Sequence, residues 1–66
     1  MNRYEKLVDV LQRVQEEERG EVLMSTHDKV VKMLDSMPDL KPHEIGMCGA
    51  ILNEVEMKLQ EVAIAK

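Results

Sequence analysis

The stretch from residue 42 to residue 66, PHEIGMCGAILNEVEMKLQEVAIAK, is the part of the chain that decides its fold. Apolar residues follow one another in it at alternating spacings of three and four: Ile45, Cys48, Leu52, Val55, Leu59 and Val62. This is the a/d repeat of a helix that packs along another helix. No other stretch is patterned as regularly, so we expect the rest of the chain to be organised around this helix.

A chain this short is expected to be only marginally stable as a monomer. Its 66 residues make one small helical domain, residues 1–66, and a chain of this length buries a smaller share of its surface than a longer one. Small proteins are usually stabilised by disulfides, by a structural metal or by association with another chain. This chain has one cysteine and two scattered histidines, which argues against disulfides and against a structural metal. We therefore expect self-association, as a homodimer or a higher helical-bundle oligomer.

The composition narrows the class of protein. Apolar residues make up 44% of the chain and include six methionines, with Tyr4 as the sole aromatic residue, which is typical of a globular chain with an aliphatic core. The net charge of -4, with nine basic residues spread along the chain, argues against nucleic-acid binding. No run approaches the length of a membrane span and MNRYE lacks an apolar signal core, so we expect a cytoplasmic protein without membrane contact.

Residues 2–18 predict a first amphipathic helix. Its apolar residues share one side: Tyr4, Leu7, Val8, Leu11 and Val14. The next positions of that face, 18 and 21, are both glutamate, and Gly20 is a poor helix former. Two interpretations are open: the helix ends near Arg19 with Gly20 as its left-handed cap, or it continues past Val22. We favour a continuous or gently kinked helix to about Leu23.

Residues 25–42 predict a helix start and a loop. Ser25 and Thr26 offer a helix cap, so a second helix over about residues 26–36 is possible, with these residues inward: Val30, Val31, Leu34 and Met37. Pro38 and Pro42 end that helix and place a loop over residues 37–42, and Pro42 suits the first position of the last helix. The predicted fold is all-α: an antiparallel helical hairpin of two long helices, or three helices if the first arm breaks near residues 20–26.

Small residues lie beside the seam of the last helix, at Gly46, Gly49 and Ala50. Glycines in a helix indicate either that another backbone comes close or that a poor helix former is tolerated. The sequence leaves both interpretations open.

The chain offers little for catalysis or metal binding. Its histidine–carboxylate neighbours are His27–Asp28 and His43–Glu44, and adjacent residues on a helix point in different directions, so neither pair forms a ligand set. Cys48 lies on the seam, where we interpret it as a core residue rather than a nucleophile. No serine triad, phosphate loop or zinc motif is present. We predict no enzyme activity, no cofactor and no metal.

One ordered set of residues runs through the second half of the chain: Met37-Pro38-x-Leu40, Ile45, Leu52-Asn53, Met57 and Leu59. This order resembles the helical hairpin of small phage proteins that sequester cyclic-nucleotide immune signals. That family carries an aromatic residue and arginines after the turn, where this chain has Pro42, His43 and Glu44. The resemblance implies an alternative function, an oligomer that binds a nucleotide in a pocket between subunits.

The leading prediction is a non-catalytic protein–protein interaction module. A continuous apolar seam must be covered, by a second copy or by another protein. We predict a small regulator or inhibitor, of a size that suits a phage or mobile element, that binds a partner protein and itself; a structural assembly factor is a further hypothesis. The residues predicted to form the helix-packing or oligomer interface are Leu7, Leu11, Val14, Ile45, Cys48, Leu52, Val55, Leu59 and Val62.

Overall fold

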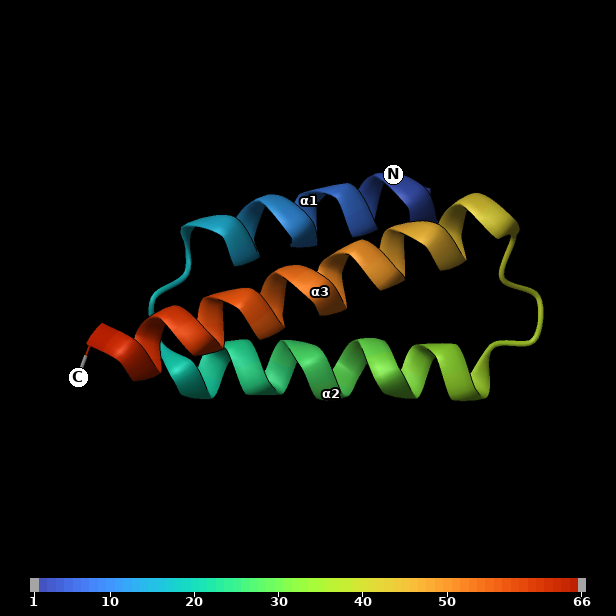
Figure 1. Cartoon of the computed structure of the whole chain (residues 1–66). Coiled ribbons are helices and arrows are strands. Elements are labelled where there is room, and N and C mark those ends of the chain that lie inside the picture. Colours follow the sequence, from blue (N-terminus) through green and yellow to red (C-terminus); the bar gives the residue numbers. More distant parts are fainter. Residues whose placement is uncertain (1, 66) are drawn as a thin grey trace.

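The computed structural model describes the backbone of residues 2–65 and the side chains of residues 2–63. These residues form three helices and no strand: α1 (Arg3–Glu16), α2 (Gly20–Ser36) and α3 (Pro42–Ala65). Helix α3 lies between α1 and α2, parallel to α1 and antiparallel to α2 (Figure 1). Both α1 and α2 pack along α3 and scarcely touch each other. The last helix is therefore the central element, and the all-α prediction is confirmed.

The first arm is divided, so the predicted continuous helix to about Leu23 is wrong. The break lies at residues 17–19, upstream of Gly20, which has no left-handed backbone and begins α2. The Glu17 carboxylate accepts hydrogen bonds from the backbone N–H groups of Glu18, at 3.0 Å, and Arg19, at 3.4 Å. A side chain that binds its own backbone in this way competes with the helical ladder.

Packing explains why the chain turns at this point. A helix continued past Glu16 would place glutamates on the face that meets α3, because positions 18 and 21 are both acidic. After the turn, α2 buries Leu23 and Val30 instead. Most of the stability of a helix in a protein comes from such a buried face. The gain in burial therefore outweighs the helical propensity of the glutamates.

The start of α3 is fixed by its own first turn. Pro42 occupies the first helical position, as predicted, where its missing N–H costs nothing. The Glu44 carboxylate reaches back to accept the backbone N–H of Lys41 at 2.9 Å, which is half of a capping box. The loop over residues 37–41 and the end of α2 at Ser36 also lie where the sequence predicts them.

The core is a single apolar cluster between α3 and the other two helices. Its buried members are Leu7, Val14, Leu23, Val30, Cys48, Ile51 and Val55. The predicted seam is offset on α3: Ile45 is 48% exposed, whereas Ile51, which the a/d pattern omits, is fully buried. Met37, predicted to point inward, is 38% exposed, because α2 ends one residue before it. The buried stripe of α3 thus starts at Glu44 and Cys48 rather than at Ile45.

Candidate functional site

A groove lies between α1 and α2 on the described surface. Its volume is about 460 Å³, and every residue that lines it belongs to α1, α2 or the turn at Glu17. None of the α3 side chains that the structure describes lines it, so the groove opens on the face of the molecule opposite α3. The groove exists because α1 and α2 both pack on α3 without closing against each other.

The floor and walls of the groove are apolar. Core side chains form the floor: Leu7, Val14, Leu23 and Val30. Half-buried residues form the walls: Val10 from α1, and Val22, Thr26 and Met33 from α2. The single polar wall residue is turned into its own helix, because the Thr26 hydroxyl donates to the carbonyl oxygen of Val22 at 2.9 Å. The groove therefore offers a strip of aliphatic surface that runs for about three turns of α2.

Charged residues stand at the rim rather than on the floor. Arg13 and Lys29 are exposed, and the Arg13 Nε lies 3.1 Å from an Asp9 carboxylate oxygen one turn earlier. At the end of the groove, a hydrogen bond from the Arg19 guanidinium and two backbone N–H groups hold the pKa of the Glu17 carboxyl below its usual value. The rim thus combines both signs of charge around an apolar centre, as protein-binding surfaces do.

A shallower hollow continues this face across α2. It has a volume of about 350 Å³ and shares Val22, Thr26 and Lys29 with the groove. Its other lining residues are Arg19, Glu21 and Ser25. The outer surface of α2 and the groove therefore form one continuous face.

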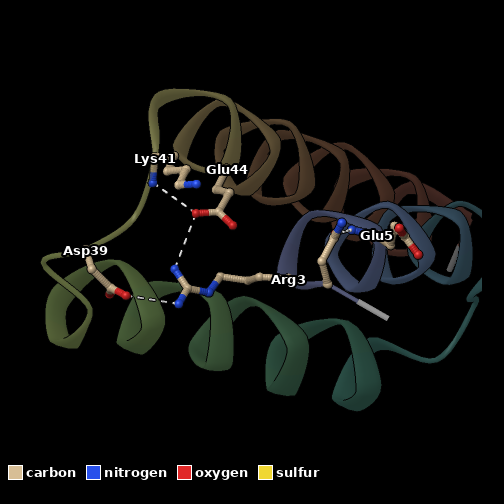
Figure 2. Close-up of polar contacts among 6 residues, drawn as sticks. Arg3, Glu5, Asp39, Lys41 and Glu44 are labelled. Carbon is tan, nitrogen blue, oxygen red and sulfur yellow. Dashed lines mark hydrogen bonds and ion pairs between the residues drawn. The ribbon is translucent and has the colours of Figure 1, made fainter.

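An arginine clasp holds α1 in place beside the groove. The Arg3 guanidinium lies between two carboxylates, 3.1 Å from Asp39 in the loop and 3.3 Å from Glu44 on α3 (Figure 2). Glu44 is 7% exposed, and the same oxygen, Oε1, accepts hydrogen bonds from both the Arg3 guanidinium and the Lys41 backbone N–H. The contact with Arg3 also lowers the pKa of the Asp39 carboxyl. The clasp thus ties the start of α1 to the loop and to the first turn of α3.

A second contact fixes the other end of α1. The Lys58 ammonium group donates to the carbonyl oxygen of Gln15 at 3.1 Å, where the last turn of α1 has unpaired carbonyl groups. Helix α2 has a longer polar contact with α3: His27 Nε2 lies 3.8 Å from a Glu56 carboxylate oxygen, and the two form an ion pair only when the imidazole is protonated. Helix α1 is thus tied to α3 at both ends.

The predicted interface residues divide between this groove and the core. Leu7 and Val14 form part of the groove floor, and Cys48 and Val55 lie fully buried behind it. The half-buried members pack against the core: Leu11, Leu52, Leu59 and Val62. Ile45 lies outside the core. Sequence reasoning missed the groove itself, although Val10, which lies off the first stripe, signals a second apolar edge on α1.

The other candidate groups do not converge on a reactive centre. His27 and His43 lie on different helices, and the Tyr4 ring meets the edge of the His43 ring at a centroid distance of 5.1 Å. Burial raises the pKa of the Cys48 thiol, with a further contribution from the charge of Glu44. In the described part of the chain, no three histidine, cysteine, aspartate or glutamate side chains are grouped to share a metal ion.

The small residues of α3 face away from the rest of the chain. A Cβ built at Gly46 or Gly49 would meet no atom within 4 Å. No backbone of the described residues approaches them, so the close-approach interpretation does not hold within this chain. Within residues 2–65, no helix combines the length and apolar content needed to cross a membrane.

The comparisons with known proteins give no relative for this chain. No family model, no curated protein and no solved structure matches it. The resemblance of the segment from Met37 onward to phage proteins that sequester nucleotides therefore stays an expectation.

Proposed function

We propose that this chain is a non-catalytic protein-interaction module, a small regulator that acts by covering a surface of another protein molecule. Its working surface is the α1–α2 groove, and the observation that carries the proposal is an apolar strip about three turns long that no described element of the chain covers. A helical-bundle oligomer, in which each chain contributes the antiparallel hairpin of α2 and α3 together with α1, is part of the proposal.

The chemistry of the groove favours a protein over a small molecule. Small-ligand sites place a few polar groups among apolar walls to fix the orientation of the ligand. Here the charged lining residues, Arg13, Lys29 and Glu17, stand at the rim, and the walls offer no polar group that is free to orient a small ligand, because the Thr26 hydroxyl is bonded within its own helix. An apolar trough between two helices is the usual receptor for a helix, which inserts side chains at spacings of three and four.

Site-specific photo-crosslinking tests the proposal. A benzophenone amino acid at Val22 lies in the groove, and the same group at Asn53, an exposed position of α3, is the matched control. We expect covalent adducts of the chain with a second protein molecule from position 22 and few from position 53. Equal yields, or adducts from position 53 alone, would contradict a role for the groove.

A thermal-shift screen distinguishes the nucleotide-binding alternative from the proposed interaction module. A ligand at 100 times its dissociation constant adds about 2.7 kcal/mol to the free energy of unfolding. We expect no such stabilisation by cyclic nucleotides. A saturating shift with any of them would favour the alternative over the interaction module.

A further inference from the structure

The face that carries the groove is large enough for an interface. The chain exposes 4782 Å² of surface, about 500 Å² more than the roughly 4,300 Å² expected for a compact monomer of 7.6 kDa. Its extents are 40 × 21 × 15 Å, and the long dimension follows α3. The 17 residues of α2 run for about 25 Å, so the face formed by α1 and α2 spans roughly 500 Å² on each partner, the size of a small, reversible interface. An occupant of this face can therefore be as large as another copy of the chain.

We infer that the occupant is a second copy, placed by a twofold axis perpendicular to the helices, so that α1 stacks on α1 and α2 on α2. Each stacked pair is antiparallel. The four helices form one bundle with the groove side chains at its centre and one α3 on each outer side. This inference rests on the proposed function and names the partner of the groove.

The charges of α1 support this arrangement. Along one edge of α1 the charged residues are the exposed Lys6, Arg13 and Glu16 and the half-buried Asp9. In chain order they are spaced by three, four and three residues and alternate in sign. An antiparallel copy centred on residue 11 sets Lys6 opposite Glu16, and Asp9 opposite Arg13, in both directions. The pattern is thus complementary to itself.

The charges on the outer face of α2 are also complementary to those of an antiparallel copy, and the centre of their pattern lies at the same height along the molecule as that of α1. Glu21 and Lys32 are exposed and centred between residues 26 and 27, so an antiparallel copy sets each opposite the other. Residue 11 lies five residues before the end of α1, and residue 26 lies six residues after the start of α2. At 1.5 Å per residue both centres stand about 8–9 Å from the turn that joins the helices. One twofold axis therefore pairs all six of these charged residues, four on α1 and two on α2.

The other face-to-face arrangement is disfavoured by the same residues. A twofold axis parallel to the helices would stack α1 on α2 of the second copy. Glu16 would then lie at the level of Glu21, and Lys6 close to the level of Lys32. Like charges placed together cost free energy, and so the charge pattern selects between the two symmetries.

The apolar content of the interface lies at its centre. Val10, Val22 and Met33 are half-buried in one chain, and the stacked copy removes them from water. The charged pairs surround them, as a polar rim surrounds an interface core. A small apolar centre with exposed ion pairs predicts a reversible dimer that weakens as salt screens the pairs.

Light scattering over a dilution series from 1 µM to 1 mM tests the inference. We expect the mass to rise to that of a dimer, and Val22→Asp to give a helical monomer while the matched Asn53→Asp variant dimerises like the wild type. A monomer at every concentration would overturn the inference. A dimer that neither low salt nor Val22→Asp affects would also overturn it.

A charge-swap cycle decides the geometry even if Val22→Asp fails to fold. Glu21 and Lys32 are 11 residues apart on one helix, about 16 Å, and cannot touch within a chain. Glu21→Lys and Lys32→Glu should each weaken the dimer about three- to thirtyfold, since two pairs are lost per dimer, and the double variant should recover it. Additive losses in the double variant would overturn the stacking of α2 on α2.

The result also separates this inference from the proposed function. If the chain is a monomer but position 22 still crosslinks to another protein, the groove is an interaction surface and the second copy is the wrong occupant. If position 22 crosslinks to nothing, both fail.

Discussion

Ile51→Ala and Ile45→Ala form a matched pair that tests the position of the core. Both remove the same three carbon atoms from the same helix, yet Ile51 is fully buried and Ile45 is 48% exposed. At about 0.8 kcal/mol per buried carbon group, the transfer loss at Ile51 is about 2.4 kcal/mol, and the remaining cavity brings the total to about 2–5 kcal/mol. At Ile45 about half of the transfer loss applies, and the better helix propensity of alanine offsets part of it.

The expected loss at Ile51 is large for so short a chain. Sixty-six residues at roughly 0.05–0.15 kcal/mol each give a free energy of unfolding of about 3–10 kcal/mol. Ile51→Ala should therefore remove a large part of the stability and lower the melting temperature by about 10 °C or more, while Ile45→Ala should shift it by only a few degrees.

Urea unfolding followed by circular dichroism at 222 nm measures the difference. All samples need the same chain concentration, because association makes stability depend on concentration. Equal losses for the two variants, or a larger loss for Ile45→Ala, would refute the offset of the buried stripe. A loss for Ile45→Ala that appears only at high concentration would instead place Ile45 in an interface between chains.

Three further results are expected. Glu44→Ala should lower the free energy of unfolding by about 1 kcal/mol, the cost of a lost helix cap, and a urea midpoint equal to the wild type would contradict the cap at Lys41. Arg3 lowers the pKa of the Asp39 carboxyl below its ordinary value of 3.8. The stabilisation of the fold by the Arg3–Asp39 pair is therefore present above about pH 4 and is lost as the pH falls through the pKa of Asp39 in the folded chain. The urea midpoint should drop less on acidification in the Asp39→Asn variant than in the wild type. The buried Cys48 thiol should react with an aromatic disulfide at least tenfold more slowly in buffer than in urea, followed by absorbance, and equal rates would show that the thiol is accessible.

The sequence was sufficient for the all-α class and for the loop at the two prolines, since these depend on local signals. Pro38 and Pro42 act through their own rings, and the loop and the first residue of α3 lie where they predict. The turn at Glu17 was not predictable in the same way. It depends on a carboxylate that binds the two following N–H groups, and glutamate has no marked preference for that role. The weak signal is the failure of the apolar stripe at position 18, which is compatible with both a helix end and a continuous helix.

The groove could not be predicted from the sequence, for a different reason. An a/d repeat describes a helix that packs on one neighbour, but α3 packs on two, and its buried stripe therefore widens and shifts toward Ile51. Because α1 and α2 both bury their apolar faces on α3, they do not have to pack against each other. Val10 illustrates this: the predicted stripe omits it, and in the structure it packs against the core and also lines the groove with Val22 and Met33. An apolar residue off the main stripe of a short amphipathic helix thus indicates a second surface to be covered, and here the self-complementary charges beside it favour another copy of the same chain.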